Sequence, residues 1–261
     1  MIKIAIDPGH GGKDRTNRGP TGYIEADGVL DISIKLRDIL TDTGSFDVKL
    51  TRDKDMTLGL SERAIIAADW GANMFISQHT NASGQPINTS VRGTEVYTSV
   101  ALNDELLAAL MAKAISAAIG TKNRGAMQRE SNKYPGEDYY TVIDTAQDRG
   151  IPHVLLIESA FHDNKEDEAL LKDEDIRLAI AKAQAAVICK FYKVQTKPIE
   201  GWKNEGIEAL ASEGVINDKE LWLAKRDEPM PVWAATLMMD NIMKRGKSVE
   251  DTQKGKVYSQ D

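Results

Sequence analysis

Four residues of this 261-residue chain have side chains suited to holding a metal ion or moving a proton: His10, Glu25, His79 and Glu158. Two histidines and one carboxylate are the usual protein ligands of a catalytic zinc ion, which keeps a water in its fourth position. A second carboxylate is then needed as the general base. The four residues are far apart in the sequence, so this chemistry depends on a fold that brings them together.

The segment IAIDPGHGG near the N-terminus predicts a strand that ends in a glycine-rich loop carrying His10. The flanking glycines let the backbone come close to whatever the imidazole touches. Either this loop binds a ligand or the histidine is incidental to a glycine cluster. The segment alone leaves both interpretations open.

Other predicted strands end at the remaining candidates. His79 ends the run FISQH and Glu158 ends the run VLLIE. We expect Glu25 in the loop after the first strand, just ahead of the first helix, where it can fold back beside His10. Because ligands of open α/β sheets bind outside the carboxyl ends of the strands, the four side chains are predicted to converge at one edge of a sheet.

The two glutamates are expected to differ in role. Glu158 follows an almost wholly apolar run, and apolar surroundings raise the pKa of a carboxylate, so it is the better candidate for the general base. Taken singly, each residue also has a plainer interpretation as a hydrogen-bonding or salt-bridging group. Ser77 with His79 suggests a nucleophile, but residues two apart on a strand lack the geometry of a triad. No partner is evident for His153 or His162, and we interpret both as structural.

Strand and helix patterns alternate over most of the chain. This alternation predicts an α/β fold with a twisted, mostly parallel sheet and helices on both faces. The predicted strands span residues 2–6, 47–51, 73–79, 93–99 and 152–159, and the predicted helices span about 29–40, 61–70, 103–118 and 173–192.

Composition limits which kinds of molecule the protein is expected to bind and where in the cell it is expected to be made. The net charge of -7 argues against nucleic acid, whose binding proteins usually present a basic face. Cys189 is the only cysteine, which excludes an intrachain disulfide and a cysteine-rich zinc site, and its setting predicts the buried face of a helix. No apolar run approaches the roughly 20 residues that span a bilayer. The first residues lack the pattern of a secretory signal, so synthesis in the cytoplasm is expected.

Five motifs occur together and in order: DPGHGG, a glutamate shortly after it, LTRDKD, SQHTNAS and VLLIESAFHDN. In this combination the chain resembles the zinc-dependent N-acetylmuramoyl-L-alanine amidases of the amidase-3 family over roughly residues 1–193. The resemblance implies a single-domain α/β fold, one zinc ion and hydrolysis of the amide between the lactyl group of N-acetylmuramic acid and L-alanine of peptidoglycan. It also implies His10, Glu25 and His79 as zinc ligands and Glu158 as the catalytic glutamate.

Further positions match the family pattern or depart from it. Asn81 corresponds to the asparagine of the His-x-Asn pattern, and Arg52 and Arg63 correspond to the family's arginines, which we interpret as support for the site. The departures are Gln78, where an apolar residue is usual, and Ala160 and His162 after the catalytic glutamate. No long insert separates His79 from Glu158, which is typical of an enzyme that is active without an activator.

The C-terminal region differs from the rest of the chain. Residues 194–201 are predicted to be a linker, and residues 202–261 to be a small helical module that loosely resembles an S-layer-homology module. Its tryptophans, Trp202, Trp222 and Trp233, either stack on cell-wall sugars or fill a small core or a dimer contact.

Two other functions stay open at this stage. A zinc carboxypeptidase that trims stem peptides would use the same residue types, and a non-catalytic peptidoglycan-binding protein would keep the scaffold alone. For the amidase, the expected route to the wall is release by lysis or through a holin pore, as for a phage endolysin or an autolysin.

Overall fold

The computed structural model describes residues 1–84, 90–194 and 207–224. The chain divides into two compact units, Met1–Gln195 and Thr196–Asp261. The larger unit carries all four candidate site residues.

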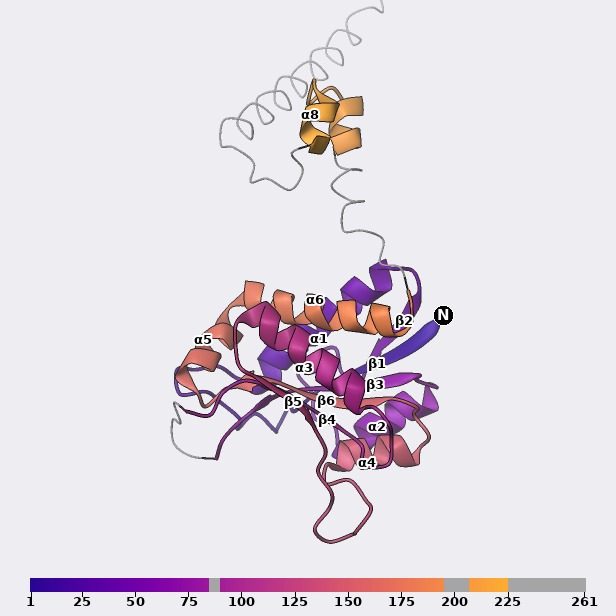
Figure 1. Cartoon of the computed structure of the whole chain (residues 1–261), viewed down its shortest axis with the longest axis vertical. Coiled ribbons are helices and arrows are strands. Elements are labelled where there is room, and N and C mark those ends of the chain that lie inside the picture. The colour runs from indigo at the N-terminus through magenta and orange to yellow at the C-terminus, as the bar shows by residue number, and fades with distance from the viewer. Residues whose placement is uncertain (85–89, 195–206, 225–261) are drawn as a thin grey trace, which may run out of the picture. The chain divides into compact units, whose positions relative to one another are not determined.

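A six-stranded sheet forms the centre of the larger unit, with strand order β2-β1-β3-β6-β4-β5 (Figure 1). Every adjacent pair is parallel except β4 and β6, which run antiparallel. The prediction of a mostly parallel sheet is therefore confirmed. The strands are β1 (Ile2–Pro8), β2 (Phe46–Leu50), β3 (Met74–Asn81), β4 (Thr94–Thr98), β5 (Asn123–Met127) and β6 (Val154–Phe161).

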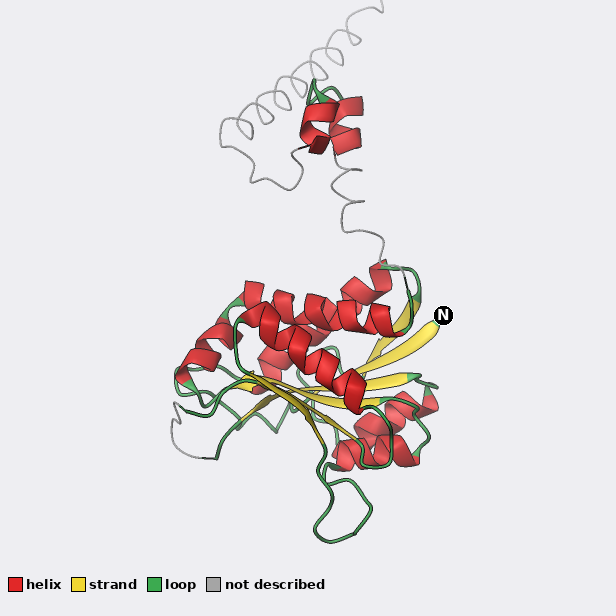
Figure 2. Ribbon diagram, in the orientation of Figure 1, coloured by secondary structure: helices red, strands yellow, loops and turns green. Residues whose placement is uncertain are grey.

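Helices cover both faces of the sheet, as predicted (Figure 2). One face carries α1 (Glu25–Asp42), α3 (Glu105–Ile119) and α6 (Glu174–Phe191), and the other carries α2 (Leu60–Asp69) and α4 (Thr141–Asp148). A short helix, α5 (Lys165–Lys172), links β6 to α6. The alternating side chains of each strand feed two separate apolar cores, so Ile4 and Ile6 pack on the first face and Ala5 on the second.

Three elements of this unit were not predicted. Strand β5 has the sequence NRGAM, in which two polar residues and a glycine leave no apolar alternation. Helices α4 and α5 have only eight residues each, too few to show a clear helical period. The start of α5 nevertheless carries a local signal, because the side chain of Asn164 accepts hydrogen bonds from the backbone of Glu166 and Asp167.

Strand β6 is buried along its whole length, as its apolar sequence predicts. Cys189 on α6 is also buried, which confirms its expected place in the core.

The glutamine at position 78, where the family usually has an apolar residue, has a structural explanation. The side chains of Gln78 and Gln184 of α6 are both fully buried, and they exchange hydrogen bonds of 2.5 and 3.0 Å between amide groups. Each buried amide thus donates one hydrogen bond and accepts one within the protein.

The described part of the smaller unit contains a helical turn at residues 207–212 and α8 (Lys219–Ala224). Val215 and Ile216 between them are buried. Nearly all of the predicted linker, Trp202 and Trp233 lie outside the described residues, so the proposed module is seen only in part. Among the described helices, none is both long and apolar enough to span a membrane.

Candidate functional site

His10, Glu25 and His79 meet beside the carboxyl ends of β1 and β3, where the sequence placed them. One ligand atom from each residue lies within 4.8 Å of the others. Glu25 Oε2 is 3.3 Å from His10 Nε2, and Glu25 Oε1 is 3.1 Å from His79 Nδ1. The three side chains therefore form a group that could hold a metal ion.

Glu25 is the first residue of α1, one step further along the chain than the loop position expected for it. Its carboxylate is almost fully buried and accepts hydrogen bonds from Thr80 N and Asn17 Nδ2, both at 2.9 Å. Burial raises the pKa of Glu25, but the contacts with His10 and His79 outweigh it and hold that pKa below its usual range. The side chain is therefore an ionised and fixed carboxylate.

His10 adopts a left-handed backbone conformation, with φ of 58°, and is followed by Gly11 and Gly12 in the same region of positive φ. This turn aims Nε2 of His10 at Glu25, while Nδ1 lies 2.8 Å from Asp14 Oδ2. Burial lowers the pKa of His10, but the neighbouring Glu25 and Asp14 carboxylates raise it overall to about 9. Asp14, which the sequence analysis missed, thus orients the ring from the side away from the cluster.

Gly9 explains why the loop needs glycine. A Cβ atom at this position would lie 2.3 Å from Cε1 of the His79 imidazole. Any larger residue would push the His79 ring out of the cluster. Gly9 therefore allows the loop to pack closely against the His79 ring.

Arg52 and Arg63 hold the histidine loop by its backbone. Arg52 donates to the carbonyls of Pro8 and Gly9 at 2.8 and 2.7 Å. Arg63 donates to the carbonyls of Pro8 and His10 at 2.7 and 2.8 Å. It also pairs with the buried carboxylate of Asp7 at 2.9 Å. Both guanidinium groups act as braces of the loop.

Glu158 lies on β6 directly opposite His79 on β3. Its carboxylate is buried, and Oε2 has no hydrogen-bond partner within the described parts of the chain. Burial, with the charges of Glu25 and Glu95 adding to it, raises the pKa of Glu158 well above its usual value. A buried carboxylate with a raised pKa and an open oxygen has the properties of a proton carrier.

Two other sequence-derived ideas are settled by contacts. The hydroxyl of Ser77 donates to Asp7 Oδ2 at 2.8 Å, so it does not form a nucleophilic pair with His79. His162 is buried, with Nδ1 2.9 Å from Thr80 Oγ1. His153 pairs with Asp104 at 2.8 Å. Both histidines therefore have partners that the sequence did not identify.

A polar group lies beyond Glu158, and the sequence did not point to two of its members, Glu95 and Arg124. Glu95 on β4 is opposite Glu158 in the antiparallel ladder. Its Oε1 accepts hydrogen bonds from Asn81 Nδ2 at 2.7 Å and from Tyr97 Oη at 2.9 Å. Arg124 Nε donates to the other carboxylate oxygen. Asn81, matched to the family pattern, therefore acts on Glu95.

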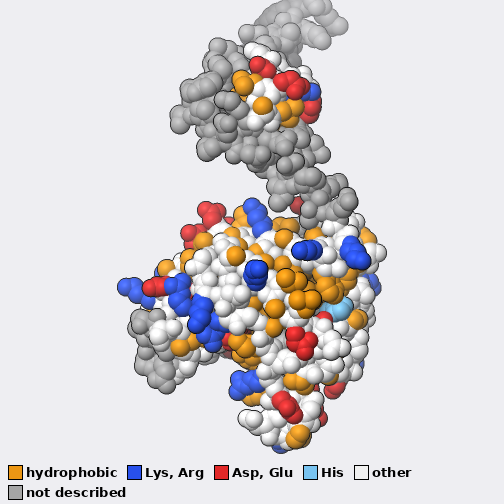
Figure 3. Space-filling view, viewed as in Figure 1, with side chains coloured by type: hydrophobic (Ala, Val, Ile, Leu, Met, Phe, Trp, Pro, Cys, Tyr) orange, Lys and Arg blue, Asp and Glu red, His pale blue; other side chains and the backbone are white. Residues whose placement is uncertain are grey.

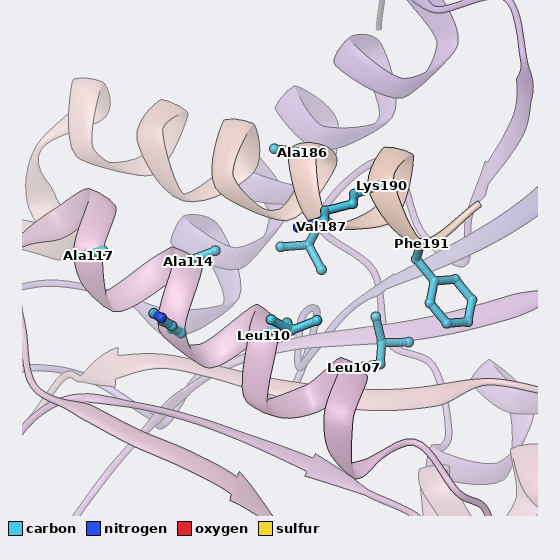
Figure 4. A pocket seen from close by; sticks show the side chains of 9 residues that line it. Leu107, Leu110, Ala114, Ala117, Ala186, Val187, Lys190 and Phe191 are labelled. Atoms are coloured by element: carbon cyan, nitrogen blue, oxygen red, sulfur yellow. The ribbon is translucent and has the colours of Figure 1, made fainter. Parts of the chain in front are cut away.

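A separate groove lies on the outer face of α3 and α6 and has a volume of about 540 Å³ (Figure 4). Leu107, Leu110, Val187 and Phe191 contribute its apolar lining, with lysines nearby. Hydrophobic side chains also gather over these helices in Figure 3. None of the four candidate site residues lines the groove, so it is distinct from the cluster of His10, Glu25 and His79.

Comparison with known proteins agrees with this geometry. The Amidase_3 family model, described as N-acetylmuramoyl-L-alanine amidase, matches residues 4–190. The chain is 29% identical over 197 residues to N-acetylmuramoyl-L-alanine amidase CwlM of Bacillus licheniformis, covering 74% of this chain and 70% of that protein. It is 31% identical over 205 residues to the endolysin of Bacillus phage SPP1, covering 76% and 69%.

A solved structure shares the fold of the larger unit. The catalytic domain of CwlV, an N-acetylmuramoyl-L-alanine amidase from Bacillus (Paenibacillus) polymyxa var. colistinus, has a TM-score of 0.63 and 30% sequence identity. The match covers 75% of this chain and all of that domain. With the family match and the convergent histidine and glutamate side chains, it follows that this chain belongs to the N-acetylmuramoyl-L-alanine amidase family.

Proposed function

We propose that His10, Glu25 and His79 hold one zinc ion and that Glu158 moves the proton when the enzyme hydrolyses the amide between N-acetylmuramic acid and L-alanine. The observation that carries this division is the contrast in hydrogen bonding between the two glutamates. Glu25 has both oxygens engaged by the histidines, Thr80 and Asn17, whereas Glu158 keeps one oxygen without a partner among the described residues.

The donor set fits zinc. Two imidazole nitrogens and one carboxylate make up a frequent ligand set of catalytic zinc sites. The contact of Asp14 with His10 Nδ1 is of the kind that fixes a metal-binding imidazole in position. When bound, zinc would polarise the lactyl carbonyl and lower the pKa of the attacking water.

Glu158 performs the proton transfers in this proposal. Its open Oε2 takes a proton from the water and delivers it to the nitrogen of L-alanine as the amide bond breaks. The raised pKa suits this task, because the same group must accept a proton and then release it near neutral pH. Burial on β6 also keeps bulk water from donating protons at the wrong step.

The proposal is tested by the products and by the metal content together. Mass spectrometry of purified peptidoglycan treated with the zinc-loaded protein is expected to show stem peptides with a free N-terminal L-alanine beside intact glycan strands. Shortened stem peptides still joined to muramic acid would instead indicate the carboxypeptidase. The family match favours the amidase over both alternatives.

Glu158→Ala is expected to lower turnover about 10²- to 10⁴-fold, the usual contribution of a general base, while one zinc ion per chain is retained. Glu174→Ala is the matched control, because Glu174 is exposed and its contact is an ion pair with Lys35. A Glu158→Ala protein without zinc would make Glu158 a ligand and refute the proposed division of roles.

For the smaller unit we propose binding to the cell wall. Trp222 on α8 is only partly buried, so part of its ring remains available to a sugar. Removing residues 196–261 should then reduce sedimentation of the enzyme with purified walls. Retained sedimentation with a change from dimer to monomer would support a dimer contact instead.

We further propose that the enzyme reaches the wall at lysis, in the manner of an endolysin. Added from outside, the purified protein should lyse cells with accessible walls, whereas protein produced inside the cell should lyse it only after the membrane is permeabilised. Lysis without permeabilisation would contradict this route.

A further inference from the structure

Four charged or ionisable groups follow one another across four neighbouring strands. His79 on β3 pairs with Glu158 on β6, and Glu158 pairs with Glu95 on β4. Residues opposite one another in adjacent strands project to the same face of a sheet. The next strand, β5, pairs Gly125 with Glu95, and the preceding residue Arg124 is skipped in the ladder.

Arg124 is therefore the extra residue of a β-bulge. The register of β4 and β5 passes from Asn123 directly to Gly125 while β4 advances by a single residue. Bulges redirect a side chain, and they are frequent beside active sites. Here the bulge allows the Arg124 side chain to reach Glu95 in the row that contains Glu158.

The contacts of Arg124 leave most of its donors unused. Nε donates to Glu95, and the guanidinium lies 5.0 Å over the ring of Phe161. Arginine has four further N–H groups on its two Nη atoms. In the described parts of the chain, none of these makes a hydrogen bond. The side chain is partly exposed, with 28% of its surface accessible.

We propose that Arg124 binds a carboxylate of the stem peptide, the free α-carboxylate of the second residue. This inference rests on the amidase function proposed above. The planar guanidinium fork matches a carboxylate in two parallel hydrogen bonds. Stacking on Phe161 and the bond to Glu95 fix the orientation of the fork before the substrate arrives.

The spacing agrees with this assignment. Arg124 lies on β5, two strands from β6, and its Nε donates to Glu95, which is directly opposite Glu158. Neighbouring strands are about 4.8 Å apart, and an extended peptide advances about 3.5 Å per residue. A peptide that runs from Glu158 across β4 therefore brings its second residue towards the Arg124 guanidinium.

Glu95 is the positioning residue in this arrangement. One oxygen of its carboxylate accepts hydrogen bonds from Asn81 and Tyr97, and the other accepts one from Arg124. It therefore connects the arginine to the strand that ends beside the histidines. The pairing also explains why a second buried carboxylate stands next to Glu158.

The test compares two soluble muropeptides in which the second residue is γ-linked D-glutamate, with a free α-carboxylate, or D-isoglutamine, with that group amidated. The wild-type enzyme is expected to prefer the free carboxylate by at least about tenfold in kcat/KM. In Arg124→Met, kcat/KM for the substrate with the free carboxylate should fall about 10- to 100-fold, mainly through a higher KM. Its kcat/KM for the amidated substrate should change little. Arg124→Lys should recover part of the loss, because it keeps the charge without the fork.

Arg149→Met is the matched control, because Arg149 is half-exposed and its ion pair with Asp69 is long, at 3.9 Å. Equal losses on both substrates would overturn the proposal and leave Arg124 a structural partner of Glu95. No loss on either substrate would overturn it as well.

A binding measurement separates this inference from the amidase function. Calorimetry with the zinc-loaded Glu158→Gln protein and the uncleaved muropeptides should show the same preference for the free carboxylate, and Arg124→Met should remove it. If the wild-type enzyme cleaves neither substrate but this preference is present, the amidase proposal fails and the carboxylate site stands. Equal binding of both muropeptides overturns the carboxylate site.

Discussion

The cluster of His10, Glu25 and His79 lies next to the Glu158 carboxylate in the fold, because His79 is opposite Glu158, yet the polar atoms of the two regions are satisfied to different degrees. Around His10 and Glu25, the described contacts engage both ring nitrogens and both carboxylate oxygens. Glu158 has an oxygen with no described partner, although it is buried. The first region has a fixed geometry, and the second keeps the oxygen that the proposed proton transfer would use.

The same contrast separates the arginines. Arg52 and Arg63 are buried and donate several hydrogen bonds each to the loop that carries His10. Arg124 is partly exposed and uses a single described donor. An arginine with satisfied donors is a brace, whereas one with free donors at the edge of a site can recognise a ligand. The number of donors that the protein itself uses therefore distinguishes an arginine that supports the loop from one that is free to bind a ligand.

The largest effect is expected from removing an arginine that holds the His10 loop. Arg63→Met removes one partner of a buried ion pair and leaves the carboxylate of Asp7 with an unmatched charge. The free energy of unfolding should fall by about 3–5 kcal/mol, measured by urea denaturation. Arg37→Met is the control, because the Arg37 contact with Asp38 is exposed and should change stability by less than about 0.5 kcal/mol. Similar values for the two variants would contradict the assigned bracing.

A smaller effect is expected from Asp14, which contacts His10 without belonging to the cluster. Asp14→Asn should weaken zinc affinity about 10- to 100-fold, because the ring loses the carboxylate that orients it. Competition with a fluorescent chelator measures this change. Asp53→Asn, an exposed position in a loop, should leave the affinity unaltered. An unchanged affinity in Asp14→Asn would show that the loop alone orients the imidazole.

The smallest effect concerns the stability of the metal-free protein. The pKa of Glu158 is higher in the folded chain than its ordinary value near 4.3, so the folded state binds this proton more tightly than the unfolded state. The carboxylate therefore costs stability as pH rises above the unfolded value. Glu158→Gln, which stays neutral, should be more stable than wild type by about 1–2 kcal/mol at pH 8.

The advantage of Glu158→Gln should shrink as pH falls towards 4.5. Thermal unfolding of both proteins in the presence of a chelator, at several pH values, measures it. A constant difference across this range would show that the titration of Glu158 is not its cause.

The convergence of the four candidate residues could be predicted from the sequence because three of them lie at or near the carboxyl ends of strands that run in the same direction. His10, His79 and Glu158 reach one edge since β1, β3 and β6 are mutually parallel. Glu95 was missed because β4 runs the other way, so its first residues, not its last, lie at that edge. Strand direction is a property of the whole fold and leaves no trace in the local alternation of side chains.

Arg124 and Asp14 were missed for different reasons. Arg124 lies on β5, whose glycine and polar residues hide the strand, and on a bulge, which has no periodic signal. Asp14 contacts His10 only because the glycine turn bends the chain back on itself. Both depend on non-repeating backbone geometry, which pattern analysis cannot supply.

The central place of β6 has a consequence for how the enzyme is made. This strand comes late in the sequence of the larger unit, yet it lies between β3 and β4 in the sheet. Until residues 154–161 have left the ribosome, β3 and β4 have unpaired edges and the chain lacks Glu158. A nascent or truncated chain that ends before β6 therefore lacks the residue proposed to move the proton, and under that proposal cell-wall cleavage has to wait until nearly the whole larger unit has been synthesised.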